Sequence, residues 1–135
     1  MSVTPPLLAT SYVALGGAVG SVARYQLGRL MTLWLGPQAM GAFPFATLAV
    51  NTVGSLAMGL LAGLLLRSGG ETEFWRLLVG VGLLGGFTTF SAFSLETAIL
   101  IQRGQIGVAG IYALLSLGLG VTGLIFGLTV SRIGT

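Results

Sequence analysis

The segment from Gly85 to Thr97, GGFTTFSAFSLET, interrupts an otherwise apolar run with paired glycines, hydroxyl residues and three phenylalanines. A helix that only faces lipid needs none of these groups. Backbone groups at membrane depth must find partners, so a segment that unwinds there is tolerated only inside protein or beside a polar cavity. The segment therefore predicts an ion site.

Polar side chains recur at helical spacing on two other runs. Thr47, Asn51 and Ser55 are four residues apart, as are Tyr112 and Ser116, so each set shares one helical face. The Asn51 amide offers two N–H donors in an apolar setting. The alternative for Asn51 is an interhelical hydrogen bond of about 1 kcal/mol. For Tyr112 and Ser116 it is an interface tyrosine and a serine bonded to its own helix.

Phe90 and Phe93 are three residues apart and project on one side if the helix resumes after the interruption. Aromatic rings carry a positive edge, which can meet an anion without a fixed charge that would hold it too tightly. Packing in the protein core is the alternative for both rings.

Glu96 is the acidic residue expected at membrane depth, where an ionisable side chain is functional until a partner is found. A carboxylate repels anions, so near an anion path it must be neutralised or turned aside. We take Arg24 as its candidate partner. The alternative places Glu96 at a helix end near water.

Composition puts these groups in a membrane. Of 135 residues 54% are hydrophobic and 7% charged, and the mean hydropathy is +0.98, whereas a soluble domain carries about a quarter charged residues. Since a spanning helix needs about 20 apolar residues, we predict an all-α membrane protein of four spans in a single domain, residues 1–135. The expected spans are residues 7–33, 44–66, 74–102 with a break at 85–91, and 106–131.

Several function classes are disfavoured by what the chain contains. The pI is near 10.2, yet the six basic residues are all arginines scattered along the sequence, so no basic patch indicates nucleic acid. The chain has no cysteine and no histidine, which removes thiolate chemistry and the usual metal ligand and proton shuttle. We do not expect an enzyme.

Arginines also bear on orientation, because basic residues beside spans normally stay in the cytoplasm. With four spans, Arg24, Arg29 and Arg103 flank connections on one side, and Arg67, Arg76 and Arg132 flank the other, three against three. This balance predicts insertion in both orientations and an antiparallel, dual-topology homodimer. Small residues four apart, such as Gly16 with Gly20 and Gly59 with Gly63, permit close helix contact. They indicate either a dimer seam or ordinary packing.

The chain resembles the CrcB, or Fluc, family of fluoride channels. The resemblance runs end to end, through GGAVGSVARYQLG at 16–28, FPFATLAVNTVGS at 43–55 and GGFTTFSAFSLET at 85–97. It implies a fluoride-selective channel for passive efflux that protects the cell from fluoride toxicity. It also implies a dual-topology dimer with two pores and a central structural sodium ion, in the inner or plasma membrane.

The same resemblance implies roles for particular residues. Main-chain carbonyls at the break, those of Gly85 and Thr88, would hold the sodium ion. Arg24 and Glu96 match family positions associated with the pore. This sequence departs from the family at Gly120, where a hydroxyl residue is usual, so the polar track on the fourth helix is shorter by one donor. The residues implied to line the fluoride path are Thr47, Asn51, Phe90, Phe93, Tyr112 and Ser116.

Two other kinds of function stay open at this point. A small proton-coupled multidrug-type exporter is also a short four-helix protein, but it needs a titratable acid in the first helix, and the first expected span has neither Asp nor Glu. In a non-transporting membrane assembly protein, the glycine-rich faces would only dock partners. Fluoride flux separates both from a channel.

Overall fold

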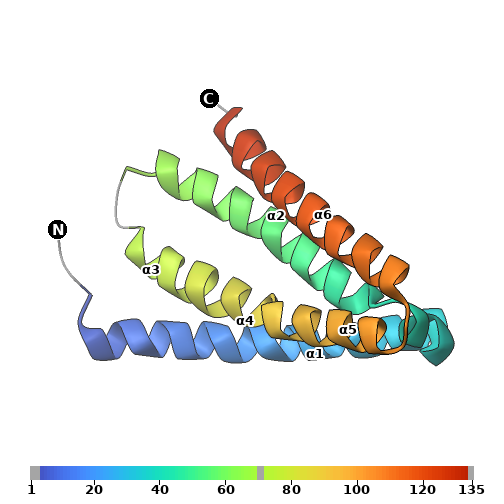
Figure 1. Ribbon diagram of the computed structural model, residues 1–135. Helices are drawn as coiled ribbons and strands as arrows, with labels where there is room; N and C mark the ends of the chain where they lie inside the picture. The colour runs from blue at the N-terminus through green and yellow to red at the C-terminus, as the bar shows by residue number, and fades with distance from the viewer. Residues whose placement is uncertain (1–3, 70–71, 134–135) are drawn as a thin grey trace.

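The computed structural model describes residues 4–69 and 72–133, and it confirms an all-α architecture of four long apolar helices with the third one broken (Figure 1). The third span, Glu73–Gln102, is assembled from four short pieces. The elements in chain order are α1 Pro6–Ala42, α2 Phe45–Arg67, α3 Glu73–Trp75, the π-helix η1 Arg76–Leu84, α4 Gly85–Phe87, α5 Phe90–Gln102 and α6 Ile106–Ile133.

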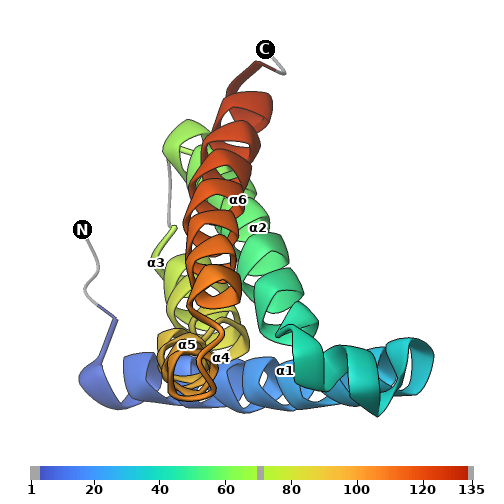
Figure 2. The ribbon, with the colours of Figure 1, turned by 45° about the vertical axis from the view of Figure 1, so that its right-hand side comes forward.

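The helices pack as two pairs: α2 lies along α6, and α1 lies along η1 and α4 (Figures 1 and 2). Glycine makes both contacts possible. A Cβ at Gly59 would collide with the carbonyl of Leu124, and one at Gly20 with the carbonyl of Leu83. The regularly spaced glycines thus serve packing within one chain, and the dimer-seam interpretation of these pairs is not needed.

The first span continues past its expected end at Leu33. Gly36 has a φ of 83°, a left-handed value that glycine adopts at little cost, and Pro37 follows it. The chain kinks at this point and helical turns resume as far as Ala42. Because proline suits the first turn of a helix, Gly36-Pro37 redirects α1 without ending it.

The third span begins at Glu73, whose carboxylate binds the N-terminal segment, and it continues as a π-helix, which is wider than an α-helix. The Glu73 carboxylate accepts bonds from the Thr4 N–H at 3.2 Å and the Thr4 hydroxyl at 2.7 Å, and Arg76 lies 3.9 Å away. The π-helix η1 follows, and the Gly85 N–H still donates to the carbonyl of Gly80, five residues earlier. The sequence pattern did not indicate this wider turn.

The break in the third span lies at Thr88 and Thr89, within the expected interval 85–91 and just after the paired glycines. Thr88 (φ −78°, ψ 158°) and Thr89 (φ −151°, ψ 122°) are both extended, while Gly85 and Gly86 remain helical within α4. β-Branched threonine favours the extended backbone. The Thr89 hydroxyl then caps α5 by accepting the Ala92 N–H at 3.2 Å.

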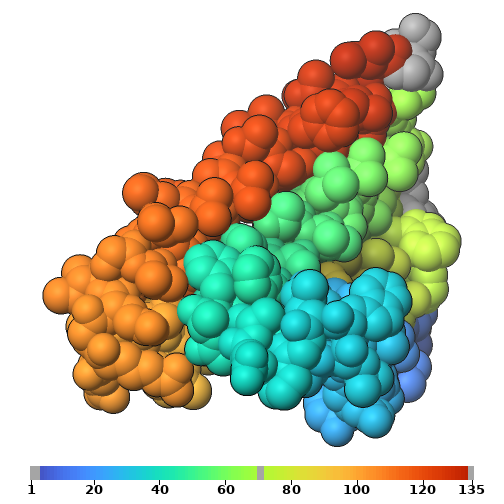
Figure 3. Space-filling model, turned by 90° about the vertical axis from the view of Figure 1, so that its right-hand side faces the viewer, coloured from blue at the N-terminus to red at the C-terminus, as the bar shows by residue number. Residues whose placement is uncertain are grey.

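The core lies at one end of the molecule, where α5 turns into α6. Buried Leu100, Ala109 and Tyr112 are packed there with Phe43 and Phe93. Figure 3 views this end, with the α5–α6 turn, the start of α2 and the last turns of α1 forming one face. Large apolar side chains are exposed on all four spans, as the lipid-facing surface of a multi-pass membrane protein requires.

Candidate functional site

One amide on α2 holds the extended backbone of the break. The Asn51 Nδ2 donates to the Thr89 carbonyl at 3.0 Å, and the Asn51 Oδ1 accepts the Thr89 N–H at 2.8 Å. Both groups of an unwound residue are thereby satisfied at membrane depth. The interhelical hydrogen bond considered for Asn51 therefore exists. Thr89 was not among the expected site residues, although paired threonines in a polar segment are a signal for extended backbone.

These contacts remove the helical donors of the Gly85 and Thr88 carbonyls, and the carbonyls of Gly86 and Phe87 between them likewise receive no backbone N–H from the described residues. In a continuous α-helix, the Thr89 N–H would donate to Gly85 and the Ala92 N–H would donate to Thr88. Here the first donates to Asn51 and the second to the Thr89 hydroxyl. The carbonyls of Gly85 and Thr88 are the two assigned to a cation by resemblance, and an unwound helix offers such oxygens to cations.

A groove beside the break brings four of the expected pore residues together. It has a volume of about 360 Å³ and is lined by Asn51, Ser55, Phe90, Phe93 and Ser116 among others. The Phe90 and Phe93 ring centres are 5.7 Å apart. The Ser116 hydroxyl is buried and makes no hydrogen bond with any described residue. The groove therefore combines amide, hydroxyl and ring groups from α2, α5 and α6.

Glu96 is held by hydroxyl groups, and Arg24 as its partner was wrong. Its carboxylate accepts the Thr47 hydroxyl and the Tyr112 hydroxyl, both at 2.7 Å. Within residues 4–69 and 72–133 the ion pair found is Arg76 with Glu73. Neutral donors thus shield the carboxylate and tie α2, α5 and α6 together. Thr47 and Tyr112 donate their hydroxyl hydrogen bonds to Glu96 and do not line the groove, and Tyr112 is fully buried.

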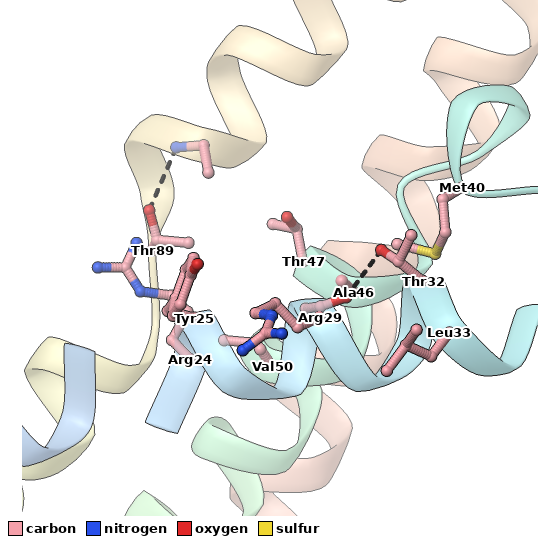
Figure 4. A pocket seen from close by; sticks show the side chains of 12 residues that line it. Arg24, Tyr25, Arg29, Thr32, Leu33, Met40, Ala46, Thr47, Val50 and Thr89 are labelled. Carbon is pink, nitrogen blue, oxygen red and sulfur yellow. Dashed lines mark hydrogen bonds between the residues drawn. The ribbon is translucent and has the colours of Figure 1, made fainter. Parts of the chain in front are cut away.

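A second hollow of about 540 Å³ lies on the other side of the break and carries positive charge (Figure 4). Arg24 and Arg29 line it together with Thr47 and Thr89. The buried Nε of Arg24 has no hydrogen-bond partner among the described residues, and Figure 4 shows its side chain among those that line the hollow. Thr89 lines both hollows, so the segment held by Asn51 lies at the boundary between them.

This geometry suits the passage of an anion. Guanidinium groups attract an anion into the second hollow, while the groove offers neutral N–H and O–H donors and ring edges. No group of three His, Cys, Asp or Glu side chains able to hold a metal ion occurs in the described part of the chain. The groove wall also has no titratable side chain that could exchange protons with a substrate.

A family model described as "CrcB-like protein, Camphor Resistance (CrcB)" matches residues 11–128. The chain belongs to the CrcB family. Among its CrcB relatives is the "Fluoride-specific ion channel FluC" of Erythrobacter litoralis, 58% identical over 134 residues, covering 98% of each chain. That of Novosphingobium aromaticivorans is 59% identical over 126 residues, 93% of this chain and 98% of the relative. That of Phenylobacterium zucineum is 52% identical over 121 residues, 89% of this chain and 92% of the relative.

Proposed function

We propose that this protein is a fluoride-selective channel that lets fluoride leave the cell passively and so protects the cell from it. The supporting observation is the groove in which the Asn51 amide, the unpaired Ser116 hydroxyl and the rings of Phe90 and Phe93 converge. The names of the CrcB relatives support fluoride as the ion.

Fluoride is small and strongly hydrated, so a pore that removes its water must supply hydrogen-bond donors in return. Conduction also requires that each site bind weakly enough to release the ion, which several neutral groups achieve better than one fixed cation. In our proposal, Arg24 and Arg29 gather anions, and the ion then passes the Asn51–Thr89 contact into the groove. Ser116 and the edges of Phe90 and Phe93 receive it there.

The driving force for efflux is the membrane potential. Hydrogen fluoride crosses bilayers as a neutral molecule and dissociates in a less acidic cytoplasm, which leaves fluoride inside. A negative-inside potential drives that anion outward by about 2.3 kcal/mol per 100 mV. A passive pore in the cell's bounding membrane is therefore sufficient for protection.

Fluoride efflux from proteoliposomes tests this function. With purified protein in liposomes, valinomycin and a potassium gradient set the membrane potential. Under these conditions we expect a fluoride electrode to record rapid release, and a chloride electrode to record release at least 100-fold slower. Empty liposomes are the control. No fluoride release, or chloride released equally fast, would refute the channel. Proton-driven uptake of organic cations without fluoride flux would favour the exporter.

We further propose that two copies of the chain assemble in opposite orientations, with two pores and one structural sodium ion between them. The balanced arginine distribution supports the dual topology. The freed carbonyls of Gly85 and Thr88 fit a hard cation, and Gly85 is exposed on a single chain, where a second copy can reach it. When bound, the ion would supply positive charge that these carbonyl dipoles coordinate, and it would join the two copies.

Sodium dependence of the dimer tests this assembly. We expect slower exchange of fluorescently labelled subunits in sodium chloride than in choline chloride or potassium chloride at the same ionic strength. Reporter fusions at the C-terminus should place that end on both sides of the membrane. Exchange rates independent of the cation would contradict the sodium site, and a single fixed location of the C-terminus would contradict the dual topology.

A further inference from the structure

Many hydroxyl side chains on or at the ends of the helices of this protein already donate to their own backbone. They donate to the carbonyl four residues earlier, which satisfies the hydroxyl without any neighbour. Residues that do so are Thr10, Ser11, Thr32, Ser68, Thr88, Ser94, Thr97, Thr129 and Ser131.

Ser55 and Ser116 are among the exceptions. Neither hydroxyl makes a hydrogen bond with any described residue, and both residues line the groove beside the break. Ser55 lies on α2 one turn after Asn51, so the two side chains share a face. Two hydroxyls that remain free to donate a hydrogen bond thus line one groove, one from α2 and one from α6.

The register between α2 and α6 explains where the Ser55 hydroxyl lies. The two helices run in the same direction, since Ser55 lies beside Gly120 and Gly59 beside Leu124 (Figure 1). A Cβ built on Gly120 would lie 3.5 Å from the Ser55 Oγ. The Ser55 hydroxyl of α2 therefore lies at the level of Gly120, where α6 has no side chain.

Ser55 is also the last polar residue that α2 or α6 contributes to the groove in the direction from Asn51 toward Met58. Beyond the level of Ser55 these helices line the groove with Met58 and Leu124, both apolar. The nearby Thr88 hydroxyl already donates to the carbonyl of Leu84.

We propose that Ser55 is a further fluoride-coordinating residue, which donates its hydroxyl to the ion one turn beyond Asn51 and fills the place left by Gly120. This inference rests on the proposed channel function. A hydroxyl without an internal partner donates to a passing halide without breaking a bond, and it adds no charge that would retain the ion. The absence of a side chain at Gly120 leaves room for the ion beside it.

The test compares Ser55→Ala with the wild-type channel in the fluoride-electrode assay. We expect efflux to fall about tenfold, as for the loss of one hydrogen bond to a charged ion. Ser68→Ala is the matched control, because Ser68 lies at the end of the same helix and donates to the Leu64 carbonyl; it should conduct at the wild-type rate.

A double variant asks whether the hydroxyl itself is what matters. Ser55→Ala combined with Gly120→Ser returns a hydroxyl to the same level from α6, and a Cβ built at position 120 meets the Ser55 Oγ at an ordinary contact distance of 3.5 Å. We expect efflux within about threefold of wild type. Wild-type efflux from Ser55→Ala, equal loss in Ser68→Ala, or loss that the double variant does not recover would each overturn the inference. Absence of flux in the wild type would instead overturn the channel function.

Discussion

Replacing Asn51 with aspartate is expected to reduce fluoride efflux at least 100-fold. The amide donates to the Thr89 carbonyl and accepts the Thr89 N–H, at 3.0 and 2.8 Å. A carboxylate keeps the acceptor but loses the donor, and its negative charge stands beside the anion path. An unsatisfied buried partner costs about 1–3 kcal/mol, so the free energy of unfolding should fall by a similar amount. Electrode traces and thermal unfolding in detergent measure the two effects.

Thr52→Val is the matched control for this variant. Thr52 is the next residue on α2, and its buried hydroxyl has no hydrogen-bond partner among the described residues. Valine is nearly isosteric and removes a desolvated polar group, so stability should be unchanged or higher, with efflux as in wild type. If Asn51→Asp conducts at the wild-type rate, the amide is not needed at the break or in the path.

Phe90→Ala is expected to lower efflux about 100-fold while leaving the subunit folded. Phe90 is 79% exposed on the single chain, so removing its ring costs little packing within the subunit. Its ring and that of Phe93 are the aromatic groups of the groove wall, and their positive edges replace part of the water lost by the ion. Efflux, together with the thermal unfolding midpoint, distinguishes loss of the path from loss of the fold.

Phe126→Ala serves as the control, because it removes the same side chain from α6 at 62% exposure and outside both hollows. We expect it to conduct like the wild type. Equal losses in Phe90→Ala and Phe126→Ala would mean that exposed aromatic surface, not the pore, is being measured.

Composition alone predicted the four apolar helices, because few other structures satisfy such a backbone in lipid. The polar segment GGFTTFSAFSLET also predicted the interrupted third helix. The break falls within the expected interval 85–91, but the sequence did not show which residues of that interval unwind. In the structure Gly85 and Gly86 are helical, and Thr88 and Thr89 are extended.

Contacts between residues far apart in the sequence are the part of the candidate site that could not be predicted. Asn51 was singled out from its spacing and chemistry, but its partner Thr89 lies 38 residues away. Glu96 was assigned to Arg24 on charge alone, whereas hydroxyl donors from α2 and α6 hold it. A single sequence gives the chemistry of each side chain but not the register between helices. The pairing of Ser55 with Gly120 likewise follows only from that register.

The segment shared by the two hollows is main chain at Thr89, held on both its N–H and its C=O by Asn51. A side chain at this boundary could change rotamer within nanoseconds. A main-chain segment held by two hydrogen bonds moves only together with the helices that it joins, in microseconds to milliseconds. The boundary at Thr89 between the arginine-lined hollow and the groove is therefore stiff, and on the route proposed above the ion would pass it by exchanging hydrogen-bond partners rather than by displacing the segment.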